Sequence, residues 1–548
     1  MNIKSLIVAL QLMALPMGCA SSIHVNKEVA ANTNNTSSTH SYSERSPTTK
    51  HQIPSNRELY IPIIELQKTA PTNITYSTQG NLISEVIQTF PQQYTDVSGV
   101  LTFRGNHLRD SPSYGNIPSN PFALQEKWTF TTSSSPKWGG GAGWTGQPSI
   151  IKWDHELKQM MNIRKEFKSN EQFVEVIYAS LDGNVYFFDH VSGKQSRPPI
   201  QINNPIKGSI SLDPRGYPLL YVGQGIPQTG NSHIGFRIYS LLDGSLLHFI
   251  KGTDSYAYRT WGAFDGAPLI NRDTDTMFLG GENGLFYAVK LNTIFDKQGG
   301  HISIQPETQK YRYKIEKQLY QGIENSVAAY KNLIFFSDNE GTLQAIDMLD
   351  MSPVWALPPT DDTDASIVID IQNDTPYLYT GTEVDKQGSK GDSILRKVNG
   401  LTGKIVWQIE IPALSILGEN PVNGGLLATP IIGKHDLKNL VIFTICRYKS
   451  LNAGLLIALD KETGEEKWRW EMPNYAWSSP VDVYTKENTG YIVQCDSQGG
   501  IYLLKGSSGK MIHSMQFNGF NIEASPAVYE DTIVVANRGG QIGAFIIK

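Results

Sequence analysis

One stretch of the sequence decides the fold: Gly454-Leu-Leu-Ile-Ala-Leu-Asp460-Lys-Glu-Thr-Gly464-Glu-Glu-Lys-Trp468. Its apolar run predicts a β-strand, and Asp460 and Gly464 predict a tight turn, because Asp bonds to its own backbone and Gly tolerates positive φ. A second strand then begins near Glu466. Trp468 lies on this second strand, and a single hairpin cannot bury so large a ring. The stretch therefore predicts a unit that needs a neighbour.

Copies of this unit recur at intervals of tens of residues, which is typical of a repeat architecture. The clearest copy ends at Trp407, after the turn at Thr402 and Gly403, and weaker ones contain Gly193, Trp355 and Gly509. Each copy opens with small residues or proline before an apolar strand. The openings are at Gly146-Gln-Pro148, Gly208-Ser209, Gly266-Ala-Pro268, Asn325-Ser326, Ala365-Ser366, Ala428-Thr-Pro430, Ser478-Ser-Pro480 and Ala524-Ser-Pro526.

These openings predict an all-β, eight-bladed propeller with four antiparallel strands in each blade. The eighth copy stops at Lys548 after three strands, whereas Leu124 to Phe130, with Trp128, looks like a fourth strand without the other three. Pairing the two removes the exposed sheet edge. We therefore expect an N-terminal strand to close the last blade, with the propeller spanning 124–548 and a pre-propeller segment spanning 96–123.

The start of the chain predicts export and lipid anchoring. Lys4 is followed by an apolar run too short to span a bilayer, as in a secretory signal peptide. Leu15-Pro-Met-Gly-Cys19 resembles a bacterial lipobox, which implies a signal peptide over 1–19 and acylation of Cys19. An ordinary signal peptide with an incidental cysteine is the alternative. We expect residues 20–95 to form a disordered tether and lead-in, because the Ser, Thr and Asn of about residues 20–55 cannot bury enough apolar surface to fold.

The turn pattern Ala-x-Asp-x-x-Thr-Gly-x-x-x-Trp resembles the pyrroloquinoline-quinone-type (PQQ-type) propeller repeat family. Within it, the chain is similar to lipid-anchored propellers of the bacterial envelope, such as those of the outer-membrane β-barrel assembly machine. The phrase Phe103-Arg104-Gly105-Asn106, with Arg109 and Gly115, also resembles the lead-in to the first blade of such proteins. The resemblance implies an extracytoplasmic protein, on the periplasmic face of an outer membrane or the outer face of a plasma membrane.

The family's enzymes stack PQQ between a tryptophan and a disulfide of adjacent cysteines, beside a calcium ion. Trp261 and Asn283 resemble the floor tryptophan and a calcium ligand. However, the three cysteines are Cys19, Cys446 and Cys495, so no adjacent pair exists, and there is no recognisable base motif. Cys446 and Cys495 end strands of neighbouring blades, and we expect two buried thiols. We therefore expect no catalytic residues and no cofactor, with PQQ and calcium as the alternative.

One set of residues is a candidate binding site. The residues directly before the eight openings should ring one end of the central channel, and a mouth with clustered carboxylates would attract a cation or a Lys/Arg-rich partner segment. Eight unrelated solvated loop ends are the alternative. The positions are Thr145, Lys207, Asp265, Glu324, Asp364, Leu427, Trp477 and Glu523.

These observations predict a monomeric, lipid-anchored envelope propeller that acts as a non-catalytic protein-interaction scaffold. The alternatives are a PQQ-dependent dehydrogenase or quinone-binding sensor, and a carbohydrate-binding surface propeller. A net charge of −5 gives no general attraction for nucleic acid. An insertion over 152–173 has helical spacing, which suits either a helix packed on its own blade or a partner-binding helix.

Overall fold

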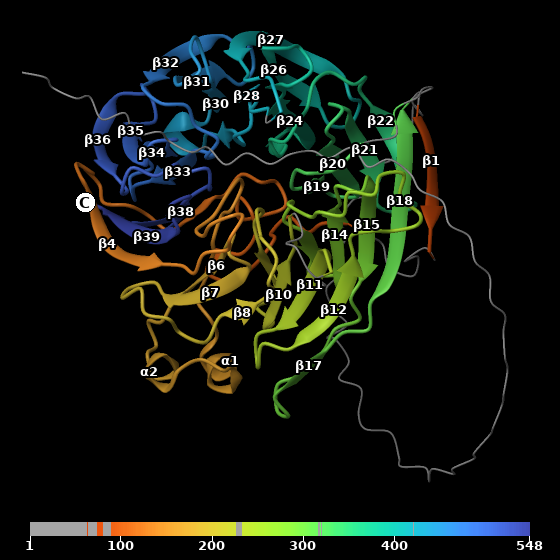
Figure 1. The fold of residues 1–548 in the computed structure, drawn as a ribbon, viewed down its shortest axis with the longest axis vertical. Helices are drawn as coiled ribbons and strands as arrows, with labels where there is room; N and C mark the ends of the chain where they lie inside the picture. Colours follow the sequence, from red (N-terminus) through yellow and green to blue (C-terminus); the bar gives the residue numbers. More distant parts are fainter. Residues whose placement is uncertain are drawn as a thin grey trace, which may run out of the picture.

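Each repeat of the sequence forms one twisted sheet, and the sheets stand side by side in a ring (Figure 1). The computed structural model describes residues 63, 74–80, 89–225, 233–315, 318, 321–419 and 421–548. Eight main sheets are present, which confirms the all-β, eight-bladed propeller. The predicted signal peptide, Cys19 and most of the predicted tether lie outside the described residues.

The strands of blades 1 to 4, from the centre of the ring outward, follow the apolar runs of the sequence. They are β5 (Ser149–Ile151), β6 (Glu175–Ala179), β7 (Asn184–Asp189) and β8 (Ile200–Gln201); β9 (Ser211–Leu212), β10 (Leu219–Val222), β11 (Gly235–Ser240) and β12 (Leu246–Lys251); β13 (Leu269–Asn271), β14 (Thr276–Gly280), β15 (Leu285–Lys290) and β18 (Glu307–Ile315); and β19 (Ala328–Tyr330), β20 (Leu333–Ser337), β21 (Leu343–Asp347) and β22 (Ser352–Ala356). Blade 3 gains an outer strand, β1 (Ile74–Gln79), and a hairpin of β16 (Ile294–Asp296) and β17 (His301–Ser303).

Blades 5 to 8 repeat the same order. They are β23 (Val368–Gln372), β24 (Thr375–Gly381), β26 (Lys390–Asn399) and β27 (Ile405–Leu414); β29 (Ile431–Ile432), β30 (Leu440–Cys446), β31 (Gly454–Asp460) and β32 (Glu466–Met472); β33 (Val481–Tyr484), β34 (Gly490–Cys495), β35 (Gly500–Lys505) and β36 (Met511–Gln516); and β37 (Ala527–Tyr529), β38 (Thr532–Asn537), β39 (Gln541–Ile547) and β4 (Leu124–Thr131). A small pair, β25 (Glu383–Val384) and β28 (Gly424–Gly425), extends blade 6, and a 3-10 turn, η1 (His435–Leu437), follows β29.

The two ends of the propeller meet in blade 8, as predicted. Strand β4 pairs antiparallel with β39, with Leu124 opposite Ile547 and Trp128 opposite Ala544. Figure 1 shows these strands side by side near the C-terminus. The pairing leaves β39 with a partner on each side, because β38 lies on the other.

The tryptophans of the repeat fasten neighbouring blades together. Trp468 of blade 6 donates its Nε1–H to the carbonyl of Gly506 in blade 7, and its ring covers Gly509. A methyl group at Gly509 would approach that ring to 2.5 Å, and the glycine has φ of +66°. Both facts favour glycine at this position. Trp128, Trp355 and Trp407 make the same contact at three other blade boundaries.

The lead-in before β4 runs through the ring and bonds to the inner strands of its blades. Its strand β2 (Gly99–Val100) pairs with β5, and β3 (Ser113–Tyr114) lies parallel to β37. Arg104 is fully buried and donates hydrogen bonds to the carbonyls of Pro430 and Pro480. Further bonds join the lead-in to the blades between: Leu212 N–H to Leu101 O, Ala329 N–H to His107 O and Ile369 N–H to Leu108 O.

Arg109 is the second buried arginine of this lead-in. Its guanidinium donates to the carbonyls of Val327, Ala267 and Phe103 at 2.8 to 2.9 Å. Buried carbonyls need such partners, so the motif around Phe103 and Arg104 acts as a structural hub. Burial lowers the pKa of both arginines.

The 152–173 insertion packs on its own blade. It forms α1 (His155–Met160) and α2 (Lys165–Lys168), and Asp154 caps α1 by accepting the N–H of Leu157 at 3.1 Å. Leu157, Met161 and Phe167 are buried in the hydrophobic core that blades 1 to 3 share. Within the described ranges, no helix is long and apolar enough to span a bilayer.

Candidate functional site: the acidic channel mouth

A circle of hydrogen bonds passes from blade to blade just inside the predicted channel mouth. In most blades, a backbone N–H of the opening segment donates to the hydroxyl at the equivalent position of the next blade. This explains why the openings carry Ser or Thr. The acceptors are Ser209, Ser326, Ser366, Thr429, Ser479 and Ser525, at 2.9 to 3.2 Å.

Three of the predicted mouth residues meet directly. Lys207 Nζ lies 2.6 Å from Asp265 Oδ2 and 3.2 Å from Glu324 Oε1. They come from blades 2, 3 and 4, which are consecutive in the ring. Asp265 is fully buried, whereas the side chains of Lys207 and Glu324 are 25% and 13% exposed. Lys207 and Glu324 are thus the members that a solute can reach.

Glu282 joins this group, although the sequence analysis missed it. Oxygens of Asp265, Glu282 and Glu324 all lie within 4.8 Å of one another. Glu282 stands two residues after the end of β14. The same position carries Asn339 in blade 4, which donates to Glu324 Oε2 at 3.2 Å. Comparing this position between repeats would have shown that a second set of side chains faces the mouth.

A second group of carboxylates lies in blade 5. Asp364 was predicted, whereas Asp362 and Glu383 were not; oxygens of the three lie within 4.8 Å of one another. Glu383 also stands two residues after its blade's second strand, β24, so the signal that identifies Glu282 identifies it too. The negative charge of Glu324 contributes to the raised pKa of both Asp362 and Asp364, so the two groups of carboxylates interact electrostatically.

Burial and crowding change the protonation of these groups. Burial, together with the charge of Glu324, raises the pKa of Asp364 to about 8. Burial and neighbouring carboxylates also raise the pKa of Glu282 and Glu383 well above the usual range. Burial disfavours the Lys207 ammonium, but Asp265 and Glu324 outweigh it and hold the pKa of Lys207 well above its usual value. Several carboxyl groups of the mouth therefore hold a proton, and an incoming cation would displace it by favouring the ionised form.

The remaining predicted mouth residues make the opposite side of the ring less acidic. Trp477 donates its Nε1–H to Cys446 Sγ at 3.1 Å, and the carbonyl of Leu427 accepts from Trp144 at 3.1 Å. Glu523 has a counter-charge, since Arg538 Nε lies 3.7 Å away. The hydroxyl of Thr145 bonds to that of Ser209. The acidic half thus spans blades 2 to 5, and blades 6 and 7 contribute Leu427 and Trp477.

Of the two residues that resembled a quinone site, Asn283 has its amide engaged within the protein and Trp261 is partly exposed. Asn283 is buried: its Nδ2 donates to Gly252 O and Tyr287 Oη, and its Oδ1 accepts from Leu285 N–H. Its amide therefore holds a turn of blade 3 and joins it to the segment that follows β12 of blade 2. Trp261 is 38% exposed. Cys446 and Cys495 are two buried free thiols, as predicted, and they offer no disulfide of adjacent cysteines.

The comparisons with known proteins agree with the fold. Residues 452–548 match the model of the family described as outer membrane protein assembly factor BamB. No curated protein matches the chain.

Solved structures with this architecture include quinohemoprotein alcohol dehydrogenases. The Comamonas testosteroni enzyme has 11% identity and a TM-score of 0.55, and the ADHIIG enzyme of Pseudomonas putida HK5 has 10% and 0.52; each match covers 82% of this chain and 80% of the other. BamB of Moraxella catarrhalis has 14% identity and a TM-score of 0.45 over 78% of this chain and 98% of its own. The chain therefore has the eight-bladed propeller fold of quinohemoprotein alcohol dehydrogenases, and residues 452–548 match the BamB assembly-factor family.

Proposed function

We propose that this chain is a lipid-anchored propeller of the bacterial cell envelope that acts as a non-catalytic protein-interaction scaffold. Three points support the proposal: the lipobox-like sequence ending at Cys19, the polar segment that follows it, and the match of residues 452–548 to an outer-membrane assembly factor. The propeller binds a Lys/Arg-rich segment of its partner at the acidic half of the channel mouth.

The observation that carries the proposal is the crowding of carboxyl groups at that mouth. Six carboxyl groups from blades 3 to 5 lie in the two groups described above, while Lys207 is the ammonium paired with them. Ionised carboxylates at such distances repel one another, so several of these groups hold protons until a cationic group enters among them. Glu324 is partly exposed and belongs to the first group while acting on the second, so a basic side chain entering there would relieve both.

The proposal is tested with a synthetic Lys/Arg-rich peptide as the probe. The double variant Asp265→Asn/Glu324→Gln should weaken peptide binding at least tenfold and reduce its dependence on salt. The matched control is Glu410→Gln/Glu419→Gln, which removes two exposed carboxylates elsewhere and should bind as wild type does.

Calcium titration of the same proteins by calorimetry separates a metal site from a partner site. Calcium binding without peptide binding would show that the mouth holds a metal ion rather than a partner. If neither the double variant nor added salt changed peptide binding, the binding surface would lie elsewhere.

A further inference from the structure

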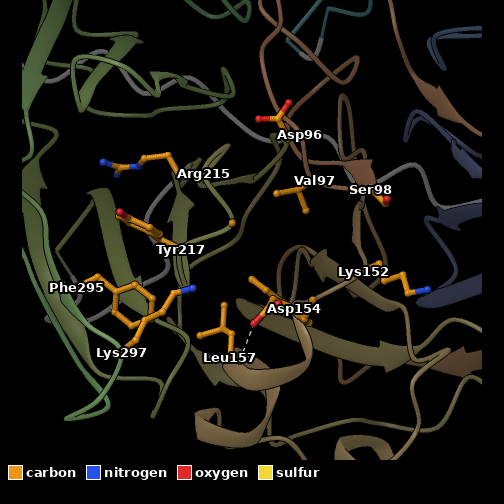
Figure 2. A pocket seen from close by; sticks show the side chains of 12 residues that line it. Asp96, Val97, Ser98, Lys152, Asp154, Leu157, Arg215, Tyr217, Phe295 and Lys297 are labelled. Carbon is orange, nitrogen blue, oxygen red and sulfur yellow. Dashed lines mark hydrogen bonds between the residues drawn. The ribbon is translucent and has the colours of Figure 1, made fainter. Parts of the chain in front are cut away.

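A cavity of about 390 Å³ lies outside the channel, where four segments of the chain converge (Figure 2). The segments are residues 96–98 of the lead-in, residues 152–157 at the start of the blade 1 insertion, the turn at 215–217 between β9 and β10, and the β16–β17 hairpin of blade 3. A cavity of this size suits a small ligand.

Two of these four segments are additions to the repeat. The α1–α2 insertion separates β5 from β6, and the β16–β17 hairpin separates β15 from β18. The equivalent strands of blade 7, from β33 to β36, follow one another through short turns. Blades 1 and 3 are not neighbours, so their insertions meet only because both reach the β9–β10 turn of the intervening blade 2.

One wall of the cavity is aromatic and held rigidly. The rings of Tyr217 and Phe295 lie 5.2 Å apart between centroids, and the guanidinium of Arg215 lies 4.4 Å from the centre of the Tyr217 ring. Arg215 is itself fixed, since its Nη2 lies 2.6 Å from Asp213 and 2.7 Å from Asp275. The charge of Arg215 is therefore paired, and its guanidinium covers part of Tyr217, while Tyr217 and Phe295 both remain partly exposed on this wall.

The polar groups of the cavity carry opposite charges. In Figure 2, Lys297 extends from the hairpin toward α1, where Asp154 lies, whereas Lys152 lies on the far side from the two rings. Neither Lys297 nor Asp154 forms a salt bridge in the part of the chain that the structure describes, although Asp154 accepts the N–H of Leu157. The cavity thus offers a donor, an acceptor and an apolar wall.

We infer that this cavity binds a neutral pyranose sugar. A sugar ring has an apolar C–H face, which suits the Tyr217 and Phe295 wall, and a rim of hydroxyls that both donate and accept. Lys297 would donate to one hydroxyl and Asp154 would accept from another. An apolar ligand would desolvate both charges without replacing their hydrogen bonds, and a charged ligand of either sign would meet a like charge at Lys297 or Asp154. The inference is independent of the channel mouth and gives the carbohydrate-binding alternative a specific location.

The test uses glucose, galactose, mannose and N-acetylglucosamine, each at about 10 mM because single sugars bind weakly. Saturation-transfer NMR should detect binding of at least one of them to the full-length protein. Phe295→Ala and Lys297→Met should each weaken that binding at least tenfold. Lys297 is exposed, so its variant should fold normally even if Phe295→Ala disturbs the hairpin.

The controls are Phe122→Ala, which removes an aromatic ring that is 69% exposed elsewhere, and Lys165→Met on α2; both should bind sugar as wild type does. Peptide binding at the channel mouth should be unchanged in all four variants, which separates this inference from the proposed function. Failure of every sugar to bind wild type would overturn the inference, as would binding that survives both cavity variants.

Discussion

Replacing Trp128 by alanine tests whether the two ends of the propeller hold the ring closed. Trp128 lies on β4 in blade 8, and its side chain reaches the turn of blade 1. Its Nε1–H donates to His190 O at 3.0 Å, its ring lies 5.6 Å from that of Phe188, and it covers Gly193. The residue is 8% exposed, so nearly the whole ring is buried.

The expected cost follows from these contacts. Replacing a buried tryptophan by alanine costs about 3–5 kcal/mol, because apolar contact is lost and a cavity remains. Trp128→Phe keeps much of the ring but removes the Nε1–H donor from His190 O, and it should cost about 1–2 kcal/mol. Trp468→Ala should cost about as much as Trp128→Ala, because Trp468 makes the same contact between blades 6 and 7.

The assay is urea unfolding followed by far-UV circular dichroism, because fluorescence would change with the number of tryptophans. Phe122→Ala, at an exposed site on the same segment, should cost less than about 0.5 kcal/mol. If Trp128→Ala cost less than about 1 kcal/mol while Trp468→Ala cost the expected amount, the closing contact would add little and the reasoning would fail.

Three further changes test the hub, the acidic mouth and the anchor. Arg109→Met should cost about 3–5 kcal/mol in urea unfolding because it leaves buried carbonyls without donors, whereas the exposed Arg164→Met should be near neutral; equal stabilities would contradict a hub. The pKa of Asp364 is raised to about 8, so the folded state holds a proton that the unfolded state releases above about pH 4, and this contribution to stability is lost as pH rises from about 4 to 8. Asp364→Asn should flatten that fall in urea unfolding, and an unchanged pH profile would argue against the raised pKa. Cys19→Ser should move the protein out of the membrane fraction, and a variant that stays there, with no lipid on wild type by mass spectrometry, would rule out acylation.

The blade count and the closing strand could be predicted from the sequence. Each copy of the repeat specifies its own blade through local properties. These are the strand length, the turn residues Asp460 and Gly464, and the spacing of Trp468 from its turn. The missing fourth strand after Lys548 and the surplus strand at Leu124 follow from the same count. The mouth positions Lys207, Asp265, Glu324 and Asp364 were also found this way, because a repeat places equivalent residues at equivalent points of a ring.

Other features depend on contacts between segments far apart in the sequence, and only the tertiary structure shows them. The sequence shows Arg104 and Arg109 only as part of a motif, whereas in the structure their guanidinium groups donate to carbonyls more than 150 residues away. Glu282 and Glu383 lie in the same blades as Asp265 and Asp364, where the start of the first strand pairs with the end of the second. Their position could have been predicted from the repeats, but the clustering of carboxylates from blades 3 and 4 depends on how the blades pack. The cavity beside Tyr217 and Phe295 forms where loops of blades 1 and 3 meet across blade 2. Loop lengths are visible in a sequence, but the direction in which each loop leaves its sheet is set by packing on its neighbours.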